Sequence, residues 1–275
     1  MRPNSYHFSF FIFQNKMQYT YLTYATENRV AYITLNRPEK RNAFNPQLVA
    51  ELKSAFQAAA ADTSAKVIVL RANGAVFSAG ADLSVLQTMQ SNSREQNFAD
   101  SQSVRELYEM MYTLPKIIIA QVQGHAIAGG CGLATVADFC IAAPEANFGY
   151  SEVKIGFIPA IVAVFLLRKI GEGRAKELLL TGKLITAAEA QQFGIINKIV
   201  PADELENAVN ALAQQLCTET SGDSLRMTKL MIAAVQEKPL ADALTYAAEQ
   251  NAASRETADC KKGIASFLNK EKLSW

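Results

Sequence analysis

The sequence predicts an α/β fold followed by a region built only of helices. Short runs of β-branched residues, too apolar for strands with one exposed face, alternate with longer segments whose apolar residues recur at helical spacing. After Pro201 the helical pattern alone continues. The 275 residues are 49% hydrophobic, which is enough to bury the core of one domain with a smaller appendage. These observations predict a core over residues 17–200 and a helical region over residues 201–275.

Residues 1–16 differ from the rest of the chain in composition. They contain the apolar block FSFFIF, which is too short for a membrane span or for the apolar stretch of a signal peptide, and no small-residue cleavage site follows it. We expect a loose N-terminal extension, with Met17 as an alternative start of translation. No other targeting signal is present in the sequence, which favours a cytoplasmic protein.

The core is predicted to consist of repeated strand–strand–helix units. Alternating patterns on either side of the segment ATENR, within residues 17–44, predict a hairpin. Later strands are expected at Lys66 to Ala72, Lys116 to Gly124, Asp138 to Pro144 and Ile195 to Pro201. Helices are expected between them at Pro46 to Ala61, Asn97 to Leu114 and Gly129 to Ala137.

The region after Pro201 is predicted to be a layer of amphipathic helices. Apolar residues three and four positions apart predict helices at Glu204 to Cys217, Ser224 to Gln236, Leu240 to Asn251 and Ser254 to Leu268. Their apolar faces need a partner, which is either the core or a neighbouring subunit.

Charge and cysteine content exclude several classes of function. Lys and Arg number 27 against 26 Asp and Glu, so no basic excess marks a nucleic-acid or membrane surface. The four cysteines show no metal-ligand spacing, and two lie in apolar runs typical of buried thiols. We expect neither a metal site nor a disulfide framework, and we expect small molecules and sister subunits as partners.

Two loops rich in glycine and alanine follow predicted strands. They are ANGAVFSAGADL, residues 72–83, and VQGHAIAGGCGL, residues 122–133. Small residues let a ligand approach the backbone, and the second loop leads into a helix N-terminus, whose free N–H groups favour negative charge. Paired backbone donors could form an oxyanion hole. The alternative is that these turns serve only tight packing between helix and sheet.

Six motifs occur in one order along the chain: NRPEKRNAF, FSAGADL, GHAIAGGCGLATVADF, FGYSEVKIGFIP, LLLTGKLITAAEAQQFGIINKIVP and GIASFLNK. Together they resemble the crotonase family, the enoyl-CoA hydratases and isomerases, from about Tyr19 to the C-terminus. The resemblance implies an α/β spiral of ββα units with a C-terminal helical region, assembled as a trimer or a dimer of trimers. It also implies binding of acyl-CoA and stabilisation of a thioester enolate. Coenzyme A would enter as part of the substrate, so no separate cofactor is expected.

The resemblance implies roles for residues in these motifs. The backbone N–H groups of Ala81 and Gly129 would donate to the thioester oxygen. Other positions match segments that hold coenzyme A: Arg41 and Ala43 along the phosphates and pantetheine, and Ala79, Asp82 and Leu83 around the adenine. Lys270 would reach a phosphate on the same or an adjacent subunit. A solvated surface charge is the alternative for Arg41 and Lys270.

Hydratases of this family use two glutamates, and the chain matches only one of them. Glu152 stands at the position of the glutamate that exchanges a proton at the α-carbon, which implies catalysis. Gly132 stands where the pattern GGGxEL has the glutamate that activates water. We therefore expect that a large side chain is missing at Gly132, and that a carboxylate of the substrate could occupy the space it leaves.

Several readings of the activity follow from this departure. The segment SEVKIGFIPAIVAVFLLRKIG resembles hydratases of branched acyl-CoAs in leucine breakdown, of the bacterial methylglutaconyl-CoA type. A 3-enoyl to 2-enoyl-CoA isomerase that uses the single Glu152 is the alternative, and a non-catalytic CoA-binding paralogue is a further one. Glu106 and Glu109 are candidate substitute carboxylates, although solvated glutamates are commoner on such a helix. For His125 we expect a packed or hydrogen-bonded side chain rather than a catalytic one.

Overall fold

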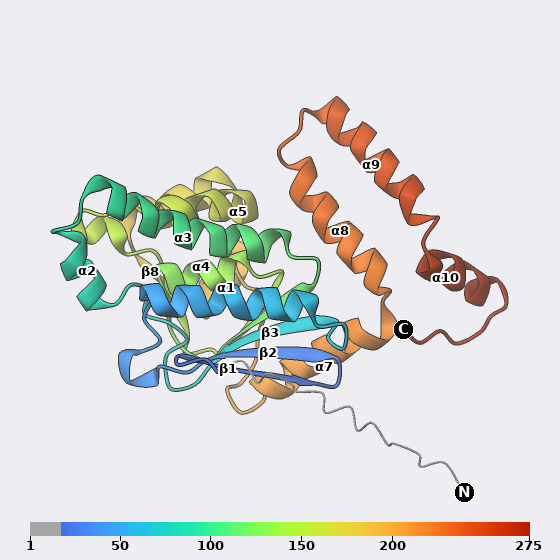
Figure 1. Cartoon of the computed structure of the whole chain (residues 1–275), viewed down its shortest axis with the longest axis horizontal. Coiled ribbons are helices and arrows are strands. Elements are labelled where there is room, and N and C mark those ends of the chain that lie inside the picture. The colour runs from blue at the N-terminus through green and yellow to red at the C-terminus, as the bar shows by residue number, and fades with distance from the viewer. Residues whose placement is uncertain (1–17) are drawn as a thin grey trace, which may run out of the picture.

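A six-stranded sheet forms the base of the molecule (Figure 1). The computed structural model describes residues 18–275, so the expected extension over residues 1–16 and the alternative start at Met17 lie outside the described residues. The strand order is β1-β2-β3-β4-β6-β9. The strands are β1 (Leu22–Glu27), β2 (Val30–Leu35), β3 (Val67–Ala72), β4 (Ile117–Val122), β6 (Phe139–Ala142) and β9 (Lys198–Ile199).

The first pair of strands is the predicted hairpin. Strands β1 and β2 are antiparallel, and Glu27 pairs with Val30. Asn28 and Arg29 form the two-residue loop with φ of 49° and 67°, the positive values that tight hairpin loops require. All other neighbours in this sheet are parallel.

Helices cover both faces of the parallel sheet. On β3, Val67 and Val69 belong to one buried cluster and Ile68 and Leu70 to another, as the alternation of a strand requires. Helix α7 (Leu205–Glu219) packs on the first face, and α1 (Pro46–Ala61) contributes to the core on the second. Burial on both faces explains the uninterrupted apolar runs. Helix α7 thus completes the core, although the sequence places it in the C-terminal region.

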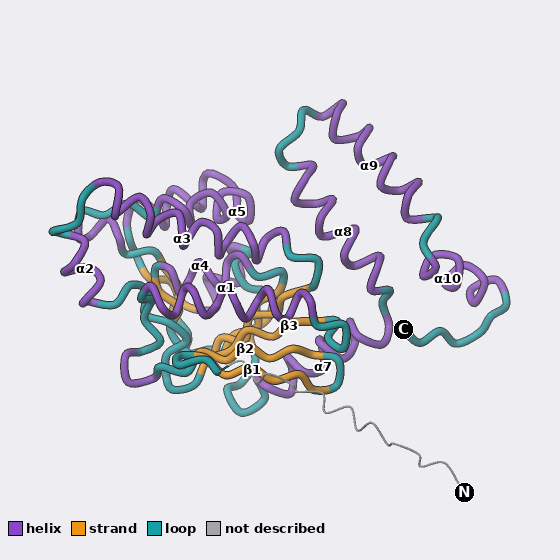
Figure 2. The backbone as a smooth tube through the Cα atoms, viewed as in Figure 1, coloured by secondary structure: helices purple, strands orange, loops and turns teal. Residues whose placement is uncertain are grey.

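Several helices lie on the same side of the large sheet as α1 (Figure 2), and a smaller sheet packs among them. The strand order of the smaller sheet is β5-β7-β8, with β5 and β7 parallel and β7 and β8 antiparallel. The remaining core elements are α2 (Leu83–Met89), α3 (Arg94–Thr113), β5 (Ala126–Ile127), α4 (Gly129–Val136), β7 (Asn147–Gly149), α5 (Ala160–Thr181), β8 (Leu184–Thr186), α6 (Ala187–Phe193) and the short 3₁₀ turns Pro38–Lys40 and Glu152–Ile155.

Some elements differ from the sequence-based expectation. Helix α3 begins at Arg94, three residues before the expected start, because Ser93 and Gln96 form a capping box. Strand β9 is limited to two residues of the expected run. Helix α5 was not predicted. Its pattern is interrupted at Gly171, which has φ 75° and ψ 167° and kinks the helix.

The last helices extend away from the sheets (Figure 1). They are α8 (Gly222–Val235), α9 (Leu240–Ser254) and α10 (Ala258–Leu268). Helix α8 packs against α3 and β4, whereas α9 packs on α8 and has no buried residue. Within residues 18–275, none of the helices combines the length and the apolar character needed to cross a membrane.

Candidate active site

The two small-residue loops lie side by side. Ser78 forms a parallel bridge with Ala126, and the N–H of Ile127 donates to Ser78 O at 2.9 Å. A Cβ built on Gly80, which has φ +82°, would lie 2.8 Å from Ala128 Cβ and 3.6 Å from the nitrogen of Gly129. The structure therefore brings the loop that carries Ala81 against the start of α4. Glycine at position 80 is required by both its conformation and this close approach.

The predicted oxyanion donors, Ala81 and Gly129, both line one cavity of about 460 Å³. Gly129 is the first residue of α4, so its N–H has no acceptor within the helix. Across residues 18–275, the N–H of neither residue donates a hydrogen bond to another protein group. Ala128, just before α4, has φ 50° and ψ −121°, an uncommon conformation for a residue with a side chain. Strain of this kind clusters at functional sites.

Glu152 lies in the same cavity. Strand β7 runs parallel to β5, so the turn that follows β7 brings residues 151 and 152 to the cavity beside the start of α4. The carboxylate oxygen Oε2 is buried and has no hydrogen-bond partner in the described chain. Burial raises the pKa of this carboxyl above its usual range. An unpaired carboxylate in the same cavity as two free N–H groups suits proton transfer next to a polarised carbonyl.

The space beside Gly132 is filled, which corrects the expectation of a vacated site. A Cβ at this position would lie 2.6 Å from Tyr108 Oη and 2.7 Å from Val162 Cγ1. These distances are shorter than any ordinary contact. A substrate carboxylate therefore finds no room at Gly132, and the glycine is explained by close packing of α4 against α3 and α5.

Tyr108 on α3 is the side chain that takes this place. It is fully buried, and its hydroxyl donates to Gly129 O at 2.7 Å. Burial and the nearby charge of Glu152 both raise the pKa of the hydroxyl, so it stays protonated at neutral pH. Sequence reasoning missed this residue because a tyrosine on an amphipathic helix carries no distinguishing signal without its partner glycine.

The carboxylate on α3 that reaches the cavity is Asp100, not one of the two glutamates considered from the sequence. Glu106 pairs with Lys53 at 2.9 Å, and Glu109 pairs with Arg105 at 2.6 Å, both outside the cavity. Asp100 lines the cavity without a hydrogen bond or ion pair to the described chain, and partial burial raises its pKa. No lysine or arginine of the described residues lines this cavity. His125 accepts a hydrogen bond from Asn147 N at 3.2 Å, as expected for a structural residue.

Most residues matched to coenzyme A lie close together, and Ala79 among them lines this cavity. The N–H of Ala79 donates to Arg41 O at 3.0 Å, and Arg37 contacts both Ala43 O and the Asp82 carboxylate. Asp82 pairs with Arg37 at 2.6 Å and caps α2 through Ser84 N, and these hydrogen bonds lower its pKa. The Asp82 side chain is therefore structural, which leaves its backbone to face a ligand. Arg41 is exposed, and Leu83, which opens α2, is 76% exposed.

Lys270 does not join this group within the chain. It follows α10, and Figure 1 places α10 at the opposite side of the molecule from α2. Contact between Lys270 and coenzyme A, on the same or an adjacent subunit, therefore stays a prediction.

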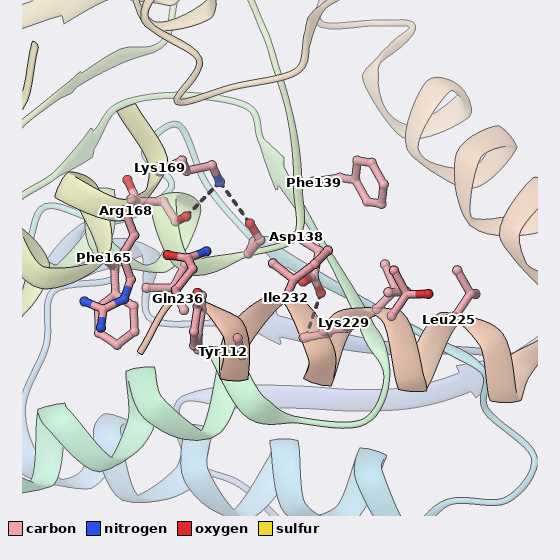
Figure 3. Close-up of a pocket in the computed structure, with 16 residues that line it drawn as sticks. Tyr112, Asp138, Phe139, Phe165, Arg168, Lys169, Leu225, Lys229, Ile232 and Gln236 are labelled. Carbon is pink, nitrogen blue, oxygen red and sulfur yellow. Dashed lines mark hydrogen bonds and ion pairs between the residues drawn. The ribbon is translucent and has the colours of Figure 1, made fainter. Parts of the chain in front are cut away.

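A second cavity, of about 390 Å³, lies beneath α8 (Figure 3). Its cations already have partners: Lys169 donates to Thr135 O at 2.7 Å and Ala137 O at 3.0 Å, and Lys229 pairs with Asp138 at 2.7 Å. These contacts attach α5 and α8 to the core. Among residues 18–275, no group of three or more His, Cys, Asp or Glu side chains is arranged to hold a metal ion.

Comparisons with known proteins show the family to which the chain belongs. The family model described as enoyl-CoA hydratase/isomerase matches residues 25–275. A Thermus thermophilus protein, whose name assigns it provisionally as an enoyl-CoA hydratase, is 41% identical over 89% of this chain and 96% of its own length. The 2,3-dehydroadipyl-CoA hydratase of Escherichia coli is 34% identical over 90% of this chain and 96% of its own.

Solved structures show the same architecture. The crystal structure of an enoyl-CoA hydratase from Shewanella pealeana superposes with a TM-score of 0.89 at 30% identity, covering 94% of this chain and 97% of that one. Fold, motif order and near full-length matches agree, and the chain belongs to the enoyl-CoA hydratase/isomerase family, the crotonase family.

Proposed function

We propose that the chain is an enoyl-CoA hydratase, which reversibly adds water across the double bond of a 2-enoyl-CoA. One observation carries the proposal. The unpaired Oε2 of Glu152 is buried in the same cavity as the free N–H groups of Ala81 and Gly129. The hydratase names of its relatives support hydration over other reactions of the family.

The proposed mechanism uses these groups in turn. The N–H groups of Ala81 and Gly129 polarise the thioester carbonyl and stabilise the enolate that forms when water attacks the β-carbon. Glu152 takes a proton from the attacking water and returns a proton to the α-carbon. Water thereby divides into a hydroxyl on the β-carbon and a hydrogen on the α-carbon. The raised pKa of Glu152 suits a group that both accepts and donates the proton.

The cavity lining bears on the acyl group. The segment SEVKIGFIPAIVAVFLLRKIG favours a branched acyl chain of the methylglutaconyl type, which carries its own carboxylate. Such a carboxylate would meet Asp100 and Glu152 without a cation from the described residues of this subunit. Burial of unpaired like charges is costly. We therefore propose an uncharged acyl chain, linear or branched, as the preferred substrate.

The CoA moiety is proposed to lie along the rim formed by Arg41, Ala43, Ala79, Asp82 and Leu83. Arg41 has no ion-pair partner among the described residues, so its guanidinium is available to a phosphate. Lys270 of a neighbouring subunit is proposed to complete the phosphate contacts in a trimer or a dimer of trimers.

The Glu152→Gln variant tests the proposal. It keeps the shape of the side chain but removes proton transfer, so the rate of crotonyl-CoA hydration should fall about 10²- to 10⁴-fold while binding of a saturated acyl-CoA persists. The control is Glu109→Gln, which removes an exposed carboxylate outside the cavity. Undiminished hydration in Glu152→Gln would contradict the assignment.

A specific observation keeps isomerisation as a second candidate. Gly132 supplies no carboxylate, and moving a proton between two carbons of the acyl chain needs only Glu152. A wild-type protein that converts 3-enoyl-CoA to 2-enoyl-CoA faster than it hydrates crotonyl-CoA would favour the isomerase. Saturable acyl-CoA binding with neither reaction would indicate a non-catalytic CoA-binding paralogue.

A further inference from the structure

The hydroxyl of Tyr108 lies where the chain has lost a carboxylate. Its oxygen would be 2.6 Å from a Cβ at Gly132, so it occupies the space into which a side chain at that position would point. It lines the same cavity as Glu152 and Gly129. This space therefore holds no charged group at neutral pH, but it does hold the neutral hydroxyl oxygen of Tyr108.

The hydrogen-bonding capacity of this hydroxyl is only partly used. Its proton is directed to Gly129 O at 2.7 Å, and it makes no other hydrogen bond to the described chain. A phenolic oxygen can also accept a hydrogen bond. Because Tyr108 is fully buried, only a small molecule enclosed in the cavity, next to the carbonyl that begins α4, can donate a hydrogen bond to this oxygen.

We propose that Tyr108 Oη holds the attacking water together with Glu152. This role rests on the hydratase function proposed above. The water donates one hydrogen bond to Tyr108 and keeps that hydrogen in the product hydroxyl. Its other proton passes to Glu152, which protonates the α-carbon, and the water oxygen forms the bond to the β-carbon. Tyr108 orients the water and accepts no proton, so Glu152 remains the base.

A purely structural role for the same hydroxyl predicts a different outcome. The bond from Tyr108 to Gly129 O ties α3 to the first turn of α4, where the oxyanion donor lies. If that tie were its whole purpose, loss of the hydroxyl would disturb the oxyanion hole and impair every reaction that passes through an enolate. If Tyr108 holds water, only hydration suffers.

The test compares two reactions of the Tyr108→Phe variant. The first is hydration of crotonyl-CoA. The second is exchange of the α-hydrogen of butyryl-CoA in deuterium oxide, which needs the oxyanion hole and Glu152 but no attacking water. We expect kcat for hydration to fall about 10²-fold, the loss that a misplacement of a reactant by about 1 Å can cause. Exchange should stay within about twofold of wild type.

Tyr112→Phe is the matched control. Tyr112 lies one turn later on α3 and packs on the same Phe165, with ring centroids 5.4 Å apart. Its hydroxyl is buried without a partner in the described chain, and it lines the cavity beneath α8 rather than that of Glu152 (Figure 3). Both reactions should be unchanged in this variant.

Three outcomes would overturn the role of Tyr108. Hydration and exchange could fall by the same factor, which would assign the residue to the structure of the oxyanion hole. Hydration could stay at the wild-type rate, which would remove the hydroxyl from the reaction. A wild-type protein that exchanges hydrogen but hydrates no 2-enoyl-CoA would overturn the proposed function itself, and the water-holding role with it. Binding of butyryl-CoA to each variant reports that the site is folded.

Discussion

At the scale of single residues, the candidate site combines a carboxylate with reduced solvation and donors without acceptors. Glu152 Oε2 is buried without a partner, and the N–H of Gly129 has no acceptor in its helix. The folded chain therefore supplies neither group with a hydrogen-bond partner. Together they are complementary to a thioester and to the proton that leaves or joins its α-carbon.

The unpaired carboxylate of Glu152 should reduce stability at high pH. Burial raises its pKa in the folded chain, so between the unfolded and folded pKa values the folded state binds more protons. The free energy of unfolding therefore falls as pH rises through this window. Glutamine does not titrate, so Glu152→Gln should raise Tm by about 2 °C at about pH 8 and have no effect at about pH 4. Thermal unfolding across this pH range measures the difference, and a gain that grows toward acid would contradict it.

Asp100 should act as a selectivity residue for the acyl group. At about pH 8 its carboxylate repels a carboxylate on the substrate, and Asp100→Asn removes that charge with little change of shape. We expect kcat/KM for 2,3-dehydroadipyl-CoA to rise about 10-fold, equivalent to about 1.4 kcal/mol, with crotonyl-CoA unchanged. The control is Glu109→Gln on the same helix. Equal changes for both substrates would exclude charge selection by Asp100.

The sequence led to some of these residues and not to others, for a physical reason. Ala81, Gly129 and Glu152 stand in local motifs, so their proximity to the site was predictable, although their roles remain predictions. Whether Asp100 and Tyr108 reach the cavity depends on which face of α3 is turned toward it. That face depends on packing against α4 and α5, and a polar residue on an amphipathic helix does not reveal it.

At the scale of elements, the position of α4 depends on how closely its neighbours approach. A Cβ on Gly130 would lie 2.5 Å from Ser78 O, and one on Gly132 would meet both Tyr108 and Val162. The glycines therefore permit α4 to pass between α3, α5 and the loop of Ala81. The two interpretations of these loops, an oxyanion hole and tight packing between helix and sheet, are therefore compatible, because the tight packing positions the N–H of Gly129.

Gly132→Ala should destabilise the fold. The added Cβ would overlap Tyr108 Oη and Val162 Cγ1, and overpacking of this kind costs about 1–3 kcal/mol. Val162→Ala removes one of the two side chains that the new Cβ would overlap. Val162→Ala should therefore lower the free energy of unfolding less in the Gly132→Ala background than in the wild-type chain. Gly173→Ala on α5 is the control, because nothing lies within 4 Å of its added Cβ, and it should be neutral or stabilising. Denaturant unfolding measures all four variants, and additive effects would contradict the shared contact.

The elements best predicted from the sequence are those with their own local signals. Helix α1 begins at Pro46, after the Asn45 cap, and ends at Ala61 as expected. Helix α5 was not predicted because Gly171 breaks its periodicity. The sheet order, which brings β6 beside β4, is set by packing between distant segments.

At the scale of the whole molecule, the core is covered and the last two helices are not. Helices close both faces of the large sheet, and the Lys229–Asp138 pair fastens α8 to it. By contrast, Leu240 and Leu244 on α9 and Phe267 on α10 are 77%, 63% and 84% exposed. Large apolar side chains gathered on one appendage mark an interaction surface. The predicted trimer or dimer of trimers would bury them and bring Lys270 to a neighbouring active site.

This assembly can be tested by sedimentation of the full chain. We expect a particle of at least three chains of 30.0 kDa at micromolar concentration. Leu244→Asp places a charge on the apolar face of α9 and should shift the population toward smaller species, because a buried unpaired charge opposes association. Thr245→Asp, which adds the same charge on a different face of α9, is the control. If loss of assembly also weakens acyl-CoA binding about 10-fold or more, the neighbouring subunit contributes to the CoA site, as a phosphate contact from Lys270 requires. A wild-type monomer with full activity would contradict both the assembly and that contact.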